Sequence, residues 1–271
     1  MSTGLTHLSP VLFLSHGGGP LPLLGDKNHQ HLLNFFAEVR PMLGKPTAIL
    51  VVSAHWEMPI PTVTSGVKPE LIYDYYGFPE PAYQIKYPAL GNPVLAEQIV
   101  DLLQQHGINA QQDAQRGFDH GLFVPLKLLF PSADIPCVQL SLLHNLDAGQ
   151  HCQIGKALAT LRTQNVLIIG SGFSFHNLNA FFAPATESSQ ADNRAFEAWL
   201  IDTCTNKQFS ETEREQRLLA WQQAPAARYC HPREEHLLPL HICYGAAGKA
   251  ANRVFEFEIL GKMASAFLWQ A

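Results

Sequence analysis

The sequence predicts an α/β fold with a mixed, largely parallel central sheet flanked by helices. Three short runs, residues 11–14, 48–52 and 166–169, are continuously apolar and rich in valine, isoleucine and leucine. Such runs are typical of strands that are buried on both faces. Segments with the apolar spacing of helices lie between them, and this alternation of strands and helices along the chain indicates an α/β architecture.

The other expected elements follow in chain order. Helices are expected at residues 30–42, 93–106 and 147–162, and a fourth, weaker strand at residues 136–143. Residues 187–217 carry many charged and amide side chains, which predicts surface helices.

One stretch stands apart from this alternation. Residues 58–93 are rich in proline, glycine and tyrosine, and they predict a long ordered loop of the kind that often carries function. Because there is no internal repeat, low-complexity tract or evident linker, we expect a single domain over residues 1–271.

Composition excludes several classes of protein. Hydrophobic residues make up 46% of the 271 residues and charged residues 15%, which is typical of a globular chain and not of a disordered one. No apolar span is long enough for a membrane helix, so a membrane is not an expected partner. The net charge of -5 comes without a basic patch, which argues against nucleic acid as a partner. The oligomeric state stays open, since no coiled-coil pattern is present.

The N-terminus and the cysteines bear on the compartment. Residues 1–10 have neither a basic segment nor an apolar one before a cleavage site, so we expect no secretory signal and a cytoplasmic location. Five cysteines without a CxxC pair are expected to be reduced and mostly buried.

Three expected strands end in small residues and then a histidine. His16 follows the first strand, His55 the second, and His176 the strand that begins at Val166. In open α/β sheets ligands bind beyond the carboxyl ends of the strands. These histidines are therefore expected to converge on one site.

Two further histidines are candidates for the same site. His120 lies between Gly117 and Gly121 and is expected on a loop before an apolar helix. His236 is expected in the first turns of a helix that begins near Pro232, with acidic residues at its start. His144, just past the weak strand, is a weak candidate. The other histidines considered are interpreted as ordinary core or surface residues, and they are His7, His29, His31, His106, His151 and His241.

The side chains at these positions indicate the chemistry. Imidazole is a ligand for iron, zinc, copper and nickel, whereas magnesium and calcium prefer oxygen. The pattern therefore predicts a metal site at the carboxyl ends of the strands, formed by His16, His55, His176 and His236. Neither a phosphate-binding GxxxxGK[ST] loop nor a GxSxG nucleophile motif is present, which disfavours these alternatives.

At these residues the sequence resembles the class III extradiol ring-cleavage dioxygenases, in particular the DOPA 4,5-dioxygenase-like branch. The motifs that match run in the family's order along the chain. They are Ser15-His16-Gly17, Ser53-Ala54-His55-Trp56, Gly77-Phe78-Pro79, Tyr87-Pro88-Ala89, Gly117-Phe118-Asp119-His120-Gly121, His176-Asn177 and Glu235-His236-Leu237-Leu238-Pro239-Leu240.

The resemblance implies one non-haem metal ion per chain, Fe(II) for activity or Zn(II) as isolated, held through His16, His55 and His236. It implies that His176 is a further ligand or the acid/base residue, and that His120 assists at the oxygen. Where the wider class has a carboxylate ligand this branch has a histidine, and Glu235 is a less favoured substitute. The expected substrates are a small aromatic diol, DOPA-like, and O2, with a muconic semialdehyde as product.

Supporting roles and rival functions complete the expectations. Asp119 and Asn177 could orient histidine rings by hydrogen bonding, and Trp56, Tyr75, Tyr76 and Phe78 could stack on an aromatic substrate.

Two other functions fit the same pattern. A zinc hydrolase would use the same ligands to activate water. A non-catalytic binding protein on the same fold is the other alternative.

Overall fold

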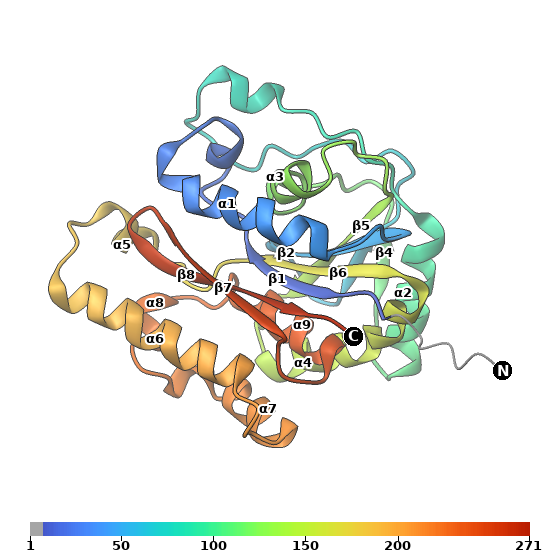
Figure 1. The fold of residues 1–271 in the computed structure, drawn as a ribbon. Coiled ribbons are helices and arrows are strands. Elements are labelled where there is room, and N and C mark those ends of the chain that lie inside the picture. The colour runs from blue at the N-terminus through green and yellow to red at the C-terminus, as the bar shows by residue number, and fades with distance from the viewer. Residues whose placement is uncertain (1–7) are drawn as a thin grey trace.

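The computed structural model describes residues 8–271, and it contains an eight-stranded sheet with helices on both faces (Figure 1). The strand order is β4-β3-β5-β2-β6-β1-β8-β7. The sheet is mixed and its centre is parallel, because β5, β2, β6 and β1 pair in parallel. The predicted fold class is therefore confirmed. The strands are β1 (Val11–Ser15), β2 (Ala48–Met58), β3 (Thr62–Thr64), β4 (Gln111–Asp113), β5 (Cys137–Leu143), β6 (Val166–Gly172), β7 (Arg253–Ile259) and β8 (Lys262–Trp269).

The central strands owe their place to their continuous apolar runs. Every residue of β1, β5 and β6 is buried, as expected for strands covered on both faces. On one face lie α1 (Gln30–Val39) and α3 (His120–Leu129), and on the other lie α4 (Ala148–Leu158) and α9 (Leu238–Ala247) (Figure 1).

The helices agree with the expected ranges, with shorter ends. The expected helix at 30–42 ends as the 3-10 turn η3 (Arg40–Met42), and that at 147–162 continues as the 3-10 turn η5 (Ala159–Gln164). The polar stretch 187–217 forms two helices that each begin with a capping box, a strong helix-start signal. The remaining helices are α2 (Pro93–Gln105), α5 (Leu178–Phe182), α6 (Glu187–Thr205), α7 (Glu211–Leu219) and α8 (Ala227–Cys230), with 3-10 turns η1 (Leu21–Leu23), η2 (Lys27–His29), η4 (Glu80–Gln84) and η6 (Trp221–Gln223).

The long loop expected at residues 58–93 is correct only in part. Its first residue still belongs to β2, and β3 joins the sheet within it. The rest is irregular apart from η4 and forms an arm above α3 (Figure 1). Buried tyrosine hydroxyls donate to backbone carbonyls there, Tyr73 to Ile85 at 2.6 Å and Tyr75 to Ala82 at 2.7 Å. These bonds order the arm.

The helices and the cysteines bear on the expected cellular context. Among residues 8–271, no helix is both long and apolar enough to cross a membrane. All five cysteines are free and buried, as expected. His7 and most of the segment considered for a signal lie outside the described residues.

Candidate metal centre

The strands β1, β6 and β2 are adjacent and parallel. His16 and His55 lie near the carboxyl ends of β1 and β2, and the chain after β6 leads to His176. His16 directly follows β1, and its backbone N–H donates to Gly172 at the end of β6. His55 lies inside β2, which continues to Met58 past an irregularity in its pairing with β5 between Val52 and Glu57. The expectation that this strand ends before the histidine is therefore wrong, because the interrupted pairing turns His55 toward the site without ending the strand.

His120 is not on a loop. It is the first residue of α3, and Asp119 is the N-cap. Its ring is nearly buried, and it therefore has the fixed position of a helix terminus.

His236 does not lie on a helix. α9 begins at Leu238 with Pro239 in its first turn, so Pro239 and not Pro232 is the helix-starting proline. The backbone carbonyl of His236 accepts the N–H of Phe173 at 2.9 Å. This bond ties the segment to the end of β6.

The five candidate histidines come together. Between ring centroids, His16 lies 4.8 Å from His55, 5.3 Å from His120 and 5.2 Å from His236. His55 lies 3.9 Å from His120, and the rings of His176 and His236 stack at 3.4 Å. Sequence positions from 16 to 236 thus form one cluster.

The hydrogen bonds around His16 fix its tautomer. Nδ1 lies 3.0 Å from Oγ of Ser171, and that hydroxyl lies 2.5 Å from the carbonyl oxygen of Gly121. A carbonyl can only accept, so the single hydroxyl proton of Ser171 goes to Gly121. Nδ1 of His16 must then donate to Ser171, and Nε2 is left with its lone pair.

Asp74 faces two histidines. Its Oδ1 accepts from Nδ1 of His120 at 2.8 Å and from the backbone N–H of His120 at 3.0 Å. Its Oδ2 lies 3.8 Å from Nδ1 of His55. Because an ionised carboxylate only accepts, Asp74 holds the proton of His120 on Nδ1 and leaves Nε2 of His120 with its lone pair; at 3.8 Å it faces His55 without a hydrogen bond.

Glu235 faces the Nδ1 atoms of the other two rings, those of His176 and His236. Its Oε1 lies 2.9 Å from Nδ1 of His236 and 3.0 Å from Nδ1 of His176. Its Oε2 lies 3.5 Å from Nη1 of Arg233, which also pairs with Glu57. Each of the five Nδ1 atoms thus faces an oxygen acceptor.

The electrostatics keep the innermost rings neutral. Burial is the largest cause that holds the pKa of His16, His55 and His236 well below the usual value, and the neighbouring histidines add to it for each ring. A histidine must be neutral to bind a metal ion. These three rings are therefore in the required protonation state near neutral pH.

The donor set fits a metal ion. Nε2 of His16 lies 3.0 Å from Nε2 of His55, and once Nε2 of His55 gives up its proton, as metal binding requires, two lone pairs face one another. Two nitrogens bound at about 2.1 Å and at right angles to one ion would be about 3.0 Å apart. His16, His55 and His236 offer three ligand atoms that all lie within 4.8 Å of one another. A cation would relieve this repulsion.

Two residues singled out by adjacency do not touch a histidine ring. Asp119 accepts from Oγ of Ser53 at 2.8 Å and from Nη2 of Arg116 at 3.1 Å. Asn177 caps α5 by accepting from the N–H of Ala180. The residues that do orient the rings are Asp74, which the sequence did not single out, and Glu235, which it suggested only as a ligand.

The aromatic candidates are placed differently from one another. The Tyr75 ring lies 5.6 Å from that of His120, and Phe78 packs edge-on against Tyr75. Trp56 is buried under the guanidinium of Arg116, whereas Tyr76 is 91% exposed. Of the four, Tyr75 is the one in contact distance of the cluster's rings.

The other histidines have separate surroundings. His144 lies 2.9 Å from the carbonyl oxygen of Glu57, and buried His241 lies 2.9 Å from that of Leu218.

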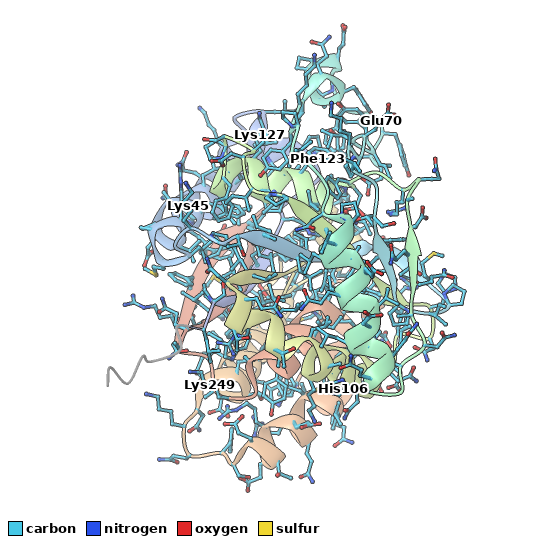
Figure 2. All side chains as sticks on the ribbon, turned by 90° about the vertical axis from the view of Figure 1, so that its right-hand side faces the viewer. Lys45, Glu70, His106, Phe123, Lys127 and Lys249 are labelled. Carbon is cyan, nitrogen blue, oxygen red and sulfur yellow. The ribbon has the colours of Figure 1, made fainter. Side chains whose placement is uncertain are left out.

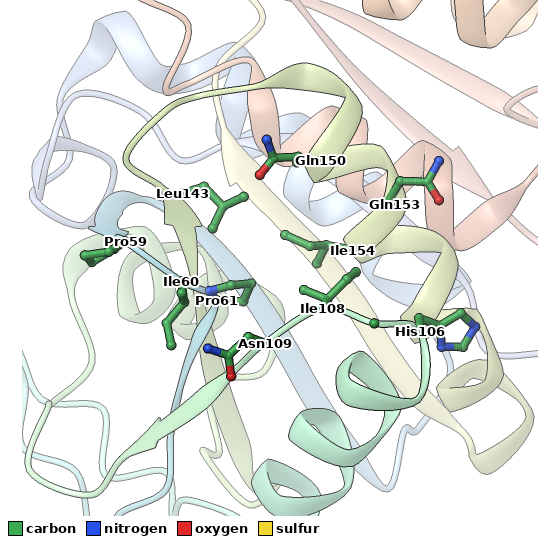
Figure 3. Close-up of a pocket in the computed structure, with 11 residues that line it drawn as sticks. Pro59, Ile60, Pro61, His106, Ile108, Asn109, Leu143, Gln150, Gln153 and Ile154 are labelled. Carbon is green, nitrogen blue, oxygen red and sulfur yellow. The ribbon is translucent and has the colours of Figure 1, made fainter.

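A cavity of about 460 Å³ lies between the β2–β3 turn, the loop after α2, and α4 (Figure 3). His106 lines it, and none of the five clustered histidines does.

Comparison with known proteins gives a consistent result. Residues 3–268 match the family model described as the catalytic LigB subunit of aromatic ring-opening dioxygenase. The dioxygenase tasH of Hapsidospora irregularis is 39% identical, over 97% of this chain and 86% of its own length. The 4,5-DOPA dioxygenase extradiol of Portulaca grandiflora is 40% identical, over 89% of this chain and 87% of its own length.

A solved structure resembles the fold as a whole. An uncharacterized protein of Escherichia coli K12 superimposes with a TM-score of 0.74 at 28% sequence identity. The match covers 96% of this chain and 99% of the other.

Proposed function

Since the chain belongs to the family of catalytic LigB subunits of aromatic ring-opening dioxygenases, we propose that it cleaves the ring of a DOPA-like catechol with O2, giving a muconic semialdehyde. The observation that carries the proposal is the set of three neutral imidazoles, those of His16, His55 and His236, whose ligand nitrogens lie within 4.8 Å of one another. Relatives named 4,5-DOPA dioxygenase extradiol support the substrate class.

His16, His55 and His236 are the proposed ligands of one non-haem metal ion per chain, Fe(II) for turnover or Zn(II) as an inactive occupant. Bound there, such an ion would stabilise the charge of a deprotonated catechol and bring the diol and O2 together. The three rings belong to different segments held by β1, β2 and the approach to α9, so the ligand geometry depends on the whole fold.

His176 is the proposed acid/base residue. Its Nδ1 lies 3.0 Å from Oε1 of Glu235, and its Nε2 would take a proton from a catechol hydroxyl and return it later. Its ring is stacked on His236 with 18° between the planes. Because both Nδ1 atoms face the same oxygen of Glu235, the stacked rings hold their Nε2 atoms side by side, so His176 would not share the ion that His236 would hold. This geometry favours His176 as the acid/base over a fourth ligand.

His120 is the proposed second catalytic residue. Nδ1 is held by Asp74, and the ring lies against His55 and Tyr75. Its Nε2 is thereby placed to accept or deliver a proton at the oxygen that reacts. Tyr75 beside it would offer an aromatic edge to the substrate ring.

The experiment that tests the function is oxygen uptake by protein reconstituted anaerobically with Fe(II) and given a panel of catechols that includes DOPA. We expect uptake together with a yellow semialdehyde product, lost in His16→Ala and His176→Ala. Absence of uptake with every catechol, together with hydrolysis by the zinc form, would replace the proposal with the hydrolase. Catechol binding without turnover would replace it with the binding protein.

Two further proposals concern the chain as a whole. Residues 1–271 form one catalytic domain, since the candidate site draws on residues from His16 to His236 of the same sheet. The location is cytoplasmic, supported by five buried, free cysteines.

A further inference from the structure

The segment that carries Asp74 is fixed beside the start of α3. The N–H of Ile72 donates to the carbonyl of Phe118, and the N–H of Phe118 donates to the carbonyl of Glu70, both at 2.8 Å. A side chain at Gly117 would place Cβ 2.2 Å from that Glu70 carbonyl, so the close approach requires glycine. Glu70 and Phe123 of α3 lie at the same end of the molecule (Figure 2).

The side chains that flank Asp74 face other partners. Tyr73 and Tyr75 both pack against Phe123, and their hydroxyls bond to the backbone of the same arm. Asp74, between these tyrosines, instead faces the site, with its carboxylate bonded to His120 and 3.8 Å from Nδ1 of His55.

The carboxylate of Asp74 also completes the start of α3. The N-cap Asp119 makes no side-chain cap hydrogen bond, and the N–H of His120 donates instead to Oδ1 of Asp74. A negative charge at a helix N-terminus is stabilising. One oxygen thus holds both the backbone and the ring of His120.

From these contacts we propose that Asp74 is a positioning residue of the active site, which fixes His120 in the Nδ1–H tautomer and directs its Nε2 to the reacting oxygen. The proposal rests on the proposed function for the role of His120. It assigns a defined task to the region of residues 58–93, which supplies the carboxylate that accepts from His120 and faces His55 at 3.8 Å.

The first test reads the tautomer without turnover. In the zinc-loaded protein with 15N-labelled histidine, NMR should show His120, assigned with His120→Gln, as the Nδ1–H tautomer. In Asp74→Ala that signature should be lost. Asp74→Asn keeps an acceptor oxygen and should largely retain it. An unchanged His120 tautomer in Asp74→Ala would overturn the proposal.

The second test reads the consequence for the reaction. In the Fe(II) form, Asp74→Ala should lower kcat by about 10- to 100-fold, the range typical of residues that orient a metal site, with KM for the catechol changed by less than about threefold. The kcat of Asp74→Asn should lie between that of the native protein and that of Asp74→Ala. A kcat unaffected by Asp74→Ala, or lowered without a tautomer change, would contradict the positioning role.

Asp113→Asn is the matched control. The Asp113 carboxylate also accepts two backbone N–H groups, those of Gln115 and Arg116, both at 2.8 Å, without touching a histidine of the cluster. It should leave the tautomer of His120 unchanged and kcat within about twofold. If no form of the protein opens a catechol ring, the proposed function fails, and the NMR result still decides the positioning of His120.

Discussion

The imidazole rings of His176 and His236 lie stacked, with centroids 3.4 Å apart and 18° between their planes. Nδ1 of His236 donates to Oε1 of Glu235 at 2.9 Å, and Nδ1 of His176 lies 3.0 Å from the same oxygen. One carboxylate therefore sets the orientation of a proposed metal ligand and of the proposed acid/base residue at the same time. Two groups with different tasks in the reaction cannot rotate independently.

Replacing Glu235 should disturb both tasks. Glu235→Ala removes the acceptor of His236 Nδ1 and the carboxylate that faces His176 Nδ1, and we expect a loss of about 10- to 100-fold in metal affinity, in kcat or in both. Metal affinity is measured by competition with a chelator, and kcat by oxygen uptake. Glu234→Gln is the control, since Glu234 pairs with Arg228 and should change neither quantity. Full metal affinity and full kcat in Glu235→Ala would show that the shared acceptor is dispensable.

Removal of a proposed ligand should release the metal ion. His16→Gln deletes the imidazole Nε2 that faces His55 at 3.0 Å, and we expect the bound metal to fall well below one ion per chain and turnover to vanish. Metal content after dialysis, measured by mass spectrometry, checks this. His106→Gln changes an exposed histidine outside the cluster and should keep the metal. A His16→Gln protein with one ion per chain would remove His16 from the ligand set.

Replacing His176 separates an acid/base from a ligand. His176→Gln should retain one metal ion per chain, because the stacked ring would not share the ion that His236 would hold, while kcat falls by about 10²- to 10⁴-fold, the usual contribution of a general acid/base. Parallel measurement of metal content and oxygen uptake decides between the roles. Loss of the metal together with activity would make His176 a ligand.

The sequence was sufficient to predict that the histidines gather at one edge of the sheet. His16 directly follows a strand whose burial could be read from its continuous apolar run, and parallel strands bring their carboxyl ends to one edge of the sheet. The convergence of His16 and His55 therefore follows from chain direction alone. The boundaries were less accurate at His120 and His236, because the helix starts at Asp119 and Leu237 lack the side-chain caps that mark such starts in a sequence.

The groups that orient the rings could not be found in this way. Asp74 lies 46 positions before His120, and no spacing rule connects a loop carboxylate to a helix that follows it at that distance. Asp119 was suggested by adjacency, but as an N-cap in extended conformation it is directed to Ser53 and Arg116. Such partners are set by tertiary packing.

Away from the site, Glu197 should make stability depend on pH. Burial raises the pKa of this carboxyl from its usual 4.5 to about 7. Between these values the folded state binds the extra proton, so the contribution of Glu197 to stability is greatest below about pH 4.5, falls as pH rises to about 7, and is constant above; the loss is at most roughly 3 kcal/mol.

Glu197→Gln isolates this effect. The amide can still accept from Oγ of Ser265, which lies 2.6 Å from Oε2 of Glu197, and it has no charge to bury. In urea unfolding experiments, the free energy of unfolding of the variant minus that of the native protein should increase from pH 5 to pH 8. An identical stability difference at both pH values would mean that the Glu197 carboxyl does not titrate in this range.

The backbone at the end of β6 leaves no room for a side chain beside His236. A Cβ at Gly172 would lie 2.1 Å from the carbonyl oxygen of His236, the same oxygen that accepts the N–H of Phe173. Gly172→Ala must therefore push the His236 segment away from β6, and we expect both a loss of stability of about 2 kcal/mol or more and weaker metal binding. Gly44→Ala is the comparison, because Gly44 has a φ of +67° and open space around its Cβ position; it should cost about 1 kcal/mol through backbone conformation alone and leave metal affinity unchanged. Urea unfolding of the metal-free proteins and chelator competition measure the two quantities separately. If Gly172→Ala lost stability but bound metal as tightly as the native protein, His236 would not be held in place by this contact, and its role as a ligand would lose its structural support.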